Sequence, residues 1–268
     1  MSKYRIVKIE EEKVAIFNSE TGEQTSQWWD HIIIEDLDKE NSYYLAYDNS
    51  KVAIFQINNP YESISQWWKE IRADSLLKGK SEYYIAENHN QKRAIFHKDN
   101  PHEPLSGWWY NIYAHELLEG KSECYIAENN NREKAIFHIN NPTQPLTQWL
   151  DNIYGHAFLE GKSKYYIAQN QNKQLALFDI NQSQYPVSGW WKTIHAEQLL
   201  QGKSHYYLAK HQNGTLAIFH TNNPYQPISQ WWNDIDPYGL IEGTSDYYIA
   251  TNQESSKAIF HKDYPDEP

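Results

Sequence analysis

Tyr83-Tyr84-Ile85-Ala86 is a four-residue segment that returns almost unchanged along the chain. The other copies begin at Tyr165 and Tyr247, close variants begin at Tyr43, Cys124 and Tyr206, and a degenerate copy begins at Tyr4. The starts at 43, 83, 124, 165, 206 and 247 are separated by 40, 41, 41, 41 and 41 residues. A fixed period of this length is the signature of tandem repeats. The 268-residue chain is therefore predicted to hold six units and a seventh opening segment.

Three further landmarks keep the same period. Ala94-Ile95-Phe96 follows the first segment, Trp108 comes twelve residues after Phe96, and Gly120-Lys121-Ser122 comes later still. The residues equivalent to Trp108 complete what we call the first-Trp column, which is Trp28, Trp67, Trp108, Trp149, Trp190 and Trp231. A second Trp follows directly in every unit except the fourth, where Leu150 replaces it. This replacement indicates an apolar core position for the second residue.

Each unit is predicted to open with a β-hairpin. Residues 83–87 and 93–97 are rich in β-branched and aromatic side chains, and Asn88-His89-Asn90-Gln91 separates them. In another unit the same gap holds Asn213-Gly214, a typical tight-turn pair. The strand is then expected to stop at the loop Asn100-Pro101-His102-Glu103-Pro104, because proline lacks the amide donor.

One or two short helices are predicted to follow this loop. A helical pattern of i, i+3, i+4 and i+7 is formed by Leu105, Trp108, Trp109 and Ile112. Ser106 is the expected N-cap of this helix. The next leucines point away from the stripe, so we expect a second helical turn that ends at Gly120.

The predicted fold class is α+β, with tandem repeats stacked as an open or curved solenoid. The whole of 1–268 is interpreted as a single repeat domain, with units starting near 4, 43, 83, 124, 165 and 206 and a capping hairpin at 247–268. The chain begins and ends with the same element, and its first copy is charged, as expected for a polar cap. A six- or seven-bladed β-propeller is the alternative, because propeller blades have a similar length.

Composition limits the partners and the location. The formal net charge is −11, from 24 basic and 35 acidic residues, which disfavours nucleic acid. No stretch reaches transmembrane length, so we predict no membrane insertion. The N-terminus lacks the apolar run of a signal peptide, so we predict a cytoplasmic location, with non-classical release left open. The single cysteine, Cys124, can form no disulfide within the chain and no Cys-based metal site.

No motif in the sequence predicts catalysis, and we predict a non-enzymatic protein without cofactor or metal. Gly-Lys-Ser lacks the earlier glycine of a phosphate-binding loop, since His115 holds that place, so it is interpreted as a helix stop. A second group of histidines near this break, His115, His156 and His195, is predicted to be structural or exposed. A histidine column after the Ala-Ile-Phe strand comprises His97, His138, His220 and His261, with Asp179, Asn18 and Gln56 at its other positions. This column is interpreted either as a repeated solvent-facing hydrogen bond or as a ligand contact.

The predicted function is multivalent binding, with carbohydrate as the favoured ligand. Near-equal units present the same surface several times, and an exposed Trp can stack on a sugar while polar groups bind its hydroxyls. The predicted ligand-binding residues are Trp28, Trp67, Trp108, Trp149, Trp190, Trp231, His97, His138, Asp179, His220 and His261. Packing between units is the other interpretation of the first-Trp column. The alternative function is a protein-interaction scaffold, such as an inhibitor or toxin-neutralising (immunity-type) protein that attracts a basic partner. Its specificity would come from the variable column Tyr110, Asp151, Lys192 and Asn233.

Overall fold

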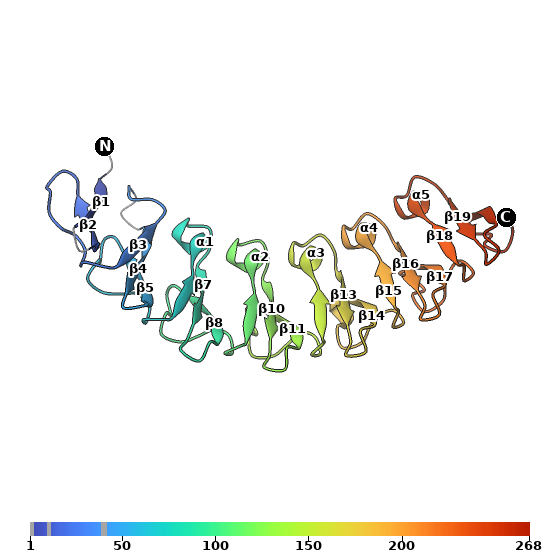
Figure 1. Ribbon diagram of the computed structural model, residues 1–268, viewed down its shortest axis with the longest axis horizontal. Helices are drawn as coiled ribbons and strands as arrows, with labels where there is room; N and C mark the ends of the chain where they lie inside the picture. The colour runs from blue at the N-terminus through green and yellow to red at the C-terminus, as the bar shows by residue number, and fades with distance from the viewer. Residues whose placement is uncertain (1–2, 10–11, 39–41) are drawn as a thin grey trace. The chain divides into compact units, whose positions relative to one another are not determined.

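The computed structural model describes residues 3–9, 12–38 and 42–268 (Figure 1). Its contacts divide the chain into two compact parts. The first part comprises Met1–Asn130 and Phe137–Gln144, and the second comprises Asn131–Ile136 and Pro145–Pro268. The prediction of a single repeat domain stays a prediction. Within the described residues, no helix is both long enough and apolar enough to cross a membrane.

The first part repeats a small antiparallel sheet, and from β6 onward one helical turn lies between the first and second strands of each sheet. Its elements are β1 (Tyr4–Lys8), β2 (Val14–Asn18), β3 (His31–Ile34), β4 (Tyr43–Asp48), β5 (Lys51–Gln56), β6 (Glu70–Arg72), α1 (Asp74–Leu77), β7 (Tyr83–Glu87), β8 (Arg93–His97), β9 (Asn111–Tyr113), α2 (His115–Leu118) and β10 (Cys124–Glu128). The sheets are β1-β2, β3-β4-β5 and β6-β7-β8, and β9 pairs with β10. The boundary between the two parts falls within β11 (Lys134–His138).

The second part has the same plan. Its elements are β12 (Asn152–Tyr154), α3 (His156–Leu159), β13 (Tyr165–Gln169), β14 (Leu175–Asp179), the 3-10 turn η1 (Ile180–Gln182), β15 (Thr193–His195), α4 (Glu197–Leu200), β16 (Tyr206–Lys210), β17 (Leu216–His220), β18 (Asp234–Asp236), α5 (Tyr238–Ile241), β19 (Tyr247–Thr251) and β20 (Lys257–His261). The sheets are β12-β13-β14, β15-β16-β17 and β18-β19-β20. The predicted hairpins and repeats of about forty residues are therefore confirmed.

The predicted helix over Leu105 to Ile112 is wrong. Residues 105–109 form an irregular segment along the free edge of β8: Leu105 N–H donates to the Ile95 carbonyl at 2.8 Å, and Trp109 bridges Arg93. The chain then crosses to the next sheet as β9, which begins at Asn111. The four apolar positions satisfied a helical period only because the run is short, and pairing with the exposed edge of β8 gave the backbone better hydrogen bonds.

Ser106 is not a helix cap but a bridge between this irregular segment and β8. Its hydroxyl accepts the buried Ile95 N–H at 2.9 Å and donates to the Gly107 carbonyl at 2.9 Å. The first of these bonds recurs in the other repeats, where the strand N–H donates to the hydroxyl from Ile16 to Ser26, Ile54 to Ser65, Ile136 to Thr147, Leu177 to Ser188 and Ile218 to Ser229. A hydroxyl residue is therefore required wherever the segment leaves the regular strand ladder, because the strand N–H would otherwise be buried without an acceptor.

The helical turn and its glycine stop are confirmed before five hairpins, which begin at β7, β10, β13, β16 and β19. Gly120 has a φ of 69°, and its N–H donates to the Leu117 carbonyl, while Lys121 N–H donates to Glu116. This is the Schellman arrangement, in which a left-handed residue satisfies the last carbonyls of a helix. In the last of these turns Pro237 directly precedes α5.

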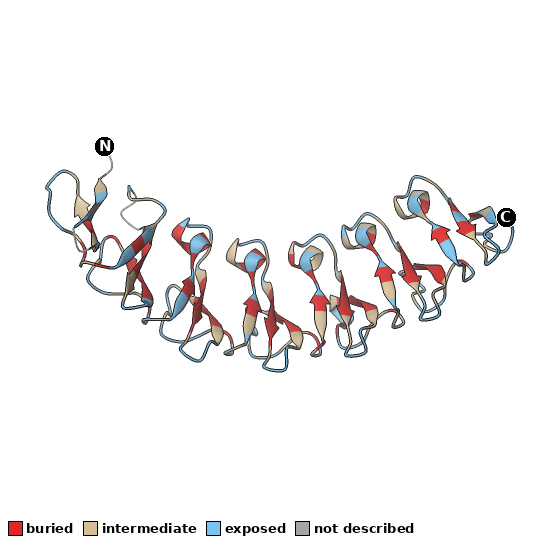
Figure 2. Cartoon of the chain, viewed as in Figure 1, coloured by how far each residue is buried: buried red, intermediate tan, exposed pale blue. Residues whose placement is uncertain are grey.

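The core lies between successive sheets of each part. Within a strand, neighbouring residues point to opposite faces, so each hairpin has an aliphatic face and a face of Tyr, Ala and Phe. In the first part, Leu45, Val52 and Ile54 of β4-β5 pack with Tyr84, Ala86, Ala94 and Phe96 of β7-β8. In the second part, Ile167 and Leu177 pack with Tyr207, Ala209, Ala217 and Phe219. Buried residues consequently concentrate in the strands (Figure 2).

Candidate binding surface

Where a repeat has two adjacent Trp residues, they pack against different hairpins, as Trp108 does on Phe96 and Trp109 on Phe137. The second Trp packs forward onto the Phe of the next hairpin, with ring centroids 5.0 Å apart for Trp29 and Phe55 and 5.1 Å apart for Trp191 and Phe219. Trp29 is only 4% exposed, and its indole nitrogen is buried. The predicted core position is buried at Trp29 and Leu150 and half-buried at Trp68, Trp109, Trp191 and Trp232, so the prediction is met in full in two repeats and in part in four. Each second Trp joins one sheet to the next.

The first-Trp column lies at the margin of the same core. Trp67 contacts Phe55 of its own repeat at 5.9 Å and Trp29 of the preceding repeat at 5.7 Å. Trp108 and Trp231 make the equivalent pairs of contacts. The side chains still expose 36%, 36% and 38% at Trp67, Trp108 and Trp231, while Trp28, Trp149 and Trp190 are half-buried. The first-Trp column therefore agrees in part with both interpretations from the sequence, packing between repeats and exposure for a ligand, because each ring packs between repeats and also reaches solvent.

Polar and aromatic residues lie close in sequence to the first-Trp column. The amide of Gln66 donates to the His102 carbonyl of the next proline loop at 3.3 Å, and the amide of Gln230 donates to Asp266 at 2.7 Å. Tyr61, Tyr185 and Tyr225 on the proline loops are 58%, 79% and 67% exposed. We call the first-Trp column with these glutamines and loop tyrosines the Trp-loop surface. Sequence reasoning missed the tyrosines, although a Tyr next to proline in a surface loop is a detectable signal.

The histidine column has a structural hydrogen bond in the loop that follows its strand. The N–H of Asp99 donates to Nδ1 of His97 at 3.2 Å, and His138, His220 and His261 accept from the residue two positions later in the same way. Asp179 and Asn18 accept the equivalent N–H through their side-chain oxygens. Since Nδ1 is the acceptor, a neutral ring carries its proton on Nε2. The shared property of this column is therefore an acceptor that caps the loop.

The histidine column and the first-Trp column lie on opposite faces of each sheet. His97 directly follows Phe96 in β8, and Trp108 packs on Phe96, whereas the His97 ring packs on Tyr83 at 5.3 Å. Adjacent strand residues point to opposite faces. The two groups of predicted ligand-binding residues are therefore not brought together within one sheet.

Several titratable groups near these columns have shifted pKa values. Burial lowers the pKa of His220, and the neighbouring His205 and Lys262 lower it further. Hydrogen bonds from His97 and Lys98 lower the pKa of Glu82. Burial raises the pKa of Cys124 to about 11 and that of Tyr248 to about 12. These shifts keep each group in its ordinary charge state near neutral pH.

The carboxylates that lie close to other charges are already paired. Glu87 is buried, and although burial opposes its ionisation, hydrogen bonds from Lys69 at 2.9 Å and Arg93 keep its pKa below the usual value. The ligand atoms of Glu82, His97 and Asp99 lie within 4.8 Å of one another. Lys98 forms ion pairs with Glu82 at 3.3 Å and with Asp99 at 2.9 Å. These groups therefore have partners without an ion.

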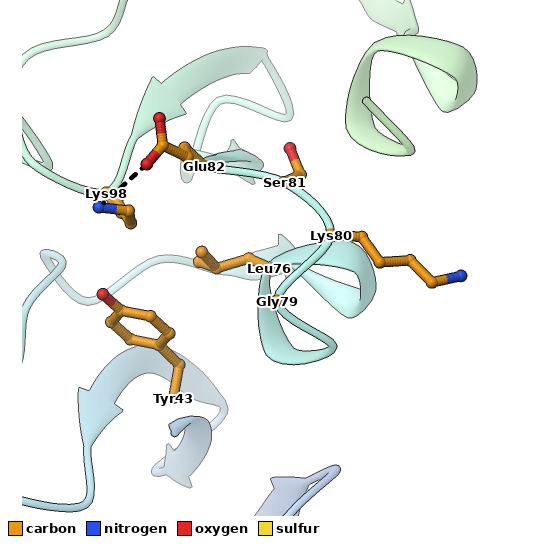
Figure 3. Close-up of a pocket in the computed structure, with 7 residues that line it drawn as sticks. All are labelled: Tyr43, Leu76, Gly79, Lys80, Ser81, Glu82 and Lys98. Atoms are coloured by element: carbon orange, nitrogen blue, oxygen red, sulfur yellow. Dashed lines mark ion pairs between the residues drawn. The ribbon is translucent and has the colours of Figure 1, made fainter. Parts of the chain in front are cut away.

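A shallow pocket in the first part lies beside the Gly-Lys-Ser turn (Figure 3). Its lining residues are Tyr43, Leu76, Gly79, Lys80, Ser81, Glu82 and Lys98. The Lys80 side chain extends away from the pocket, and its ammonium lies 3.4 Å from Glu119. The Ser81 hydroxyl accepts the Tyr83 N–H at 3.0 Å. The turn therefore ends a helix and starts a strand, as the sequence predicts.

The second group of histidines is exposed. His115 and His156 begin α2 and α3, and His195 ends β15. The prediction of a structural or exposed placement agrees with these positions. None of these three histidines belongs to the Trp-loop surface.

The fold and surface together define a class: a tandem-repeat protein of small antiparallel sheets with a recurring, half-exposed Trp. No protein-family model matches the chain, and no curated protein sequence is similar to it. The functional interpretation therefore starts from the repeated surface itself.

Proposed function

We propose that this protein is a multivalent binding protein whose Trp-loop surface recognises carbohydrate. The observation that carries the proposal is the partial exposure of the first-Trp column, 36–38% at Trp67, Trp108 and Trp231, beside a second column that packs into the core. An indole held on its inner side by Phe and Trp has a fixed orientation, so little conformational entropy is lost when a ligand stacks on it.

The chemistry of the Trp-loop surface suits a sugar. Its apolar parts are the indole and the exposed loop tyrosines, and its polar parts include the side-chain amides of Gln66 and Gln230. Ligand sites commonly combine an apolar lining with a few polar groups that fix orientation. In this proposal the sugar contacts come from the first-Trp column and the loops. The histidine column contributes by holding the proline loops in place.

The proposal includes an open stack of repeats. Within each part, the aliphatic face of one sheet packs against the Tyr, Ala and Phe face of the next, which supports continuation by the same contact. Such a stack presents the first-Trp column as a row of equivalent sites. Linked weak sites gain avidity of about 10² to 10⁴ when the target is also multivalent.

A glycan array tests the proposal. We expect the 268-residue chain to bind at least one class of glycan, to be eluted by that free glycan, and to bind dense displays more tightly than sparse ones. The variant Trp67→Ala/Trp108→Ala is expected to lose binding by about tenfold to a hundredfold, equivalent to roughly 1.4 to 2.7 kcal/mol. A folded wild-type protein that binds no glycan across broad arrays would contradict the proposal.

A matched control separates stacking from general aromatic stickiness. Tyr238 on α5 is 68% exposed and lies outside the Trp-loop surface. The variant Tyr238→Ala is expected to bind as the wild type does. Equal losses in Tyr238→Ala and Trp67→Ala/Trp108→Ala would count against specific recognition by the first-Trp column.

A protein-interaction scaffold is the second candidate, favoured by the variable column that follows the Trp pair. Tyr110, Lys192 and Asn233 are exposed and Asp151 is half-buried, and these four side chains differ in charge and size. Variation at an exposed position within otherwise similar repeats suits a surface that distinguishes partners. The net charge of −11 would attract a basic protein. One stoichiometric basic partner in a pull-down, not displaced by sugars, favours this function over the first.

A further inference from the structure

The residue just before each opening strand meets the histidine column of its own hairpin. Three such pairs are Glu82 with His97 at 3.3 Å, Glu123 with His138 at 3.0 Å and Lys164 with Asp179 at 2.7 Å. In both Glu–His pairs the carboxylate lies at Nε2 of the imidazole ring. In these three hairpins the position therefore joins an acidic side chain to a basic one.

The β16-β17 hairpin in the second part places two histidines at this position instead. The rings of His205 and His220 have centroids 5.7 Å apart and planes inclined by 42°. Nδ1 of His220 accepts the Asn222 N–H at 3.1 Å, so Nε2 is the nitrogen left for the facing side chain, as in the Glu–His pairs. Among the described residues, the His205 side chain has no hydrogen bond or ion pair, and none joins the two rings.

The distance between the two rings is the distance that a shared metal ion requires. Two imidazoles bound to one tetrahedral ion place their ring centroids about 5 Å apart, given metal–nitrogen bonds of about 2 Å. The observed 5.7 Å differs from this by less than the movement of one exposed side chain, and His205 is exposed. The two rings can therefore close on one ion without a change in the hairpin.

The surroundings of the two histidines favour ligation. Tyr206 packs edge-on against the His220 ring at 4.8 Å, and together with the Asn222 bond this contact fixes the orientation of the ring. A histidine must be neutral to bind a metal, and burial and nearby positive charge lower the pKa of His220. Lys262 is one of these charges, but its ammonium lies 2.6 Å from Asp246, which offsets its repulsion of a cation.

We propose that His205 and His220 bind one divalent transition-metal ion, through Nε2 of His220 and a ring nitrogen of His205. Imidazole nitrogen selects Zn²⁺, Ni²⁺ and Cu²⁺ over Mg²⁺ and Ca²⁺, which take oxygen ligands. Water completes the coordination, because the pair is open to solvent on the His205 side. The site lies on the face of the histidine column and is independent of carbohydrate binding by the Trp-loop surface.

Titration of the 268-residue chain with Zn²⁺, followed by proton–nitrogen NMR spectra of the histidine rings, tests this proposal. We expect the ring nitrogens of His205 and His220 to shift before those of the other histidines and to saturate below about 1 mM Zn²⁺. Binding should weaken between about pH 7 and about pH 5, because protons compete for the same nitrogens. Mg²⁺ should leave both rings unshifted. If both rings stay unshifted by Zn²⁺, or if other histidines shift first, the proposal is overturned.

Three variants assign the two ligands. His205→Gln and His220→Asn are each expected to raise the dissociation constant for Zn²⁺ about tenfold or more. His220→Asn retains an acceptor for the loop N–H, as Asn18 does, and circular dichroism verifies that each variant is folded. The matched control is His211→Asn, which removes an exposed histidine of the same hairpin and should bind Zn²⁺ as the wild type does. Unchanged affinity in His205→Gln, or an equal loss in His211→Asn, would contradict the assignment.

Discussion

The two residues of each Trp pair, such as Trp28 and Trp29, are adjacent in sequence but have different surroundings. Trp29 is 4% exposed and packs on the next Phe, whereas in the next repeat Trp67 keeps 36% of its surface open at the margin of the core. The difference arises because the segment is irregular, and its two adjacent side chains pack against different hairpins. A helix would have placed both indoles on one side.

The recurrence of a Trp at one position of the repeat therefore does not distinguish a core residue from a surface residue. Both columns recur in nearly every repeat, and both make aromatic contacts. What separates them is the neighbour that each ring packs on and how exposed it can be: the second Trp packs on the Phe of the next hairpin and is buried or half-buried, whereas the first Trp packs on the Phe of its own hairpin and is half-buried or exposed. The first-Trp column combines a packed inner side with an open outer side, which is the property that the proposed function uses.

The largest expected effect comes from removing a second Trp. Trp29→Ala is predicted to lower the free energy of unfolding by about 3 to 5 kcal/mol, because it opens a cavity against Phe55. Trp67→Ala should cost about 1 to 2 kcal/mol, since part of that ring is already in water. Chemical denaturation measures both values. Equal losses would show that the two columns are equivalent.

The Ser106 bridge ties the segment that carries the Trp pair to β8. Ser106→Ala leaves the buried Ile95 N–H without its acceptor and is predicted to cost about 1 to 3 kcal/mol. Ser106→Thr should retain most of the stability, because Thr147 makes the same bond to Ile136 at 3.0 Å. Denaturant titration of the two variants checks this, and a Thr variant as unstable as the Ala variant would contradict the assigned role.

A smaller effect is expected at the hairpin tip, away from both columns. Gln91 has a φ of 59°, a left-handed conformation that favours glycine, and Gly214 occupies the equivalent place in another repeat. Gln91→Gly is therefore predicted to stabilise the protein by about 0.5 to 1 kcal/mol, less the added entropy of the unfolded chain. Thermal unfolding measures the gain, and ligand binding should not change. A loss of stability would show that the tip conformation is not strained.

The smallest effect is a pH dependence from His220. Its pKa is lowered in the folded protein, so the unfolded chain takes up a proton first as the pH falls below about 6.5. Stability from the neutral ring is complete above that pH and declines as the pH falls toward the folded-state pKa. His220→Asn keeps an acceptor, as Asn18 does, and should flatten the dependence between pH 7 and pH 5. An unchanged pH profile in this variant would contradict the assignment.

The sequence predicts the repeats well because their landmarks are fixed in spacing. The hairpin at Tyr83, the proline loop and the stop at Gly120 follow from local rules about turns, proline and glycine. The path of the chain from Leu105 to Ile112 does not follow from such local rules, because a stripe of four apolar residues fits a helix and also an irregular strand. The bond from Ile95 to Ser106 spans eleven residues and leaves no periodic signal.

The candidate surface is only partly predictable for a similar reason. The first-Trp column was identified by its recurrence, but its partial exposure depends on contacts between repeats, such as that of Trp67 with Trp29. Recurrence groups the histidine column with the first-Trp column in the sequence. The hydrogen bond from Asp99 to His97 and the strand alternation place the histidines on the other face.

The most direct test is the broadening of Trp ring signals by a soluble paramagnetic agent, measured by NMR on the 268-residue chain. The account predicts strong broadening for the rings of the first-Trp column and protection for the second Trp residues, most clearly for Trp29. Similar broadening in both columns, or protection of the first, would contradict the division into surface and core on which the proposed function depends.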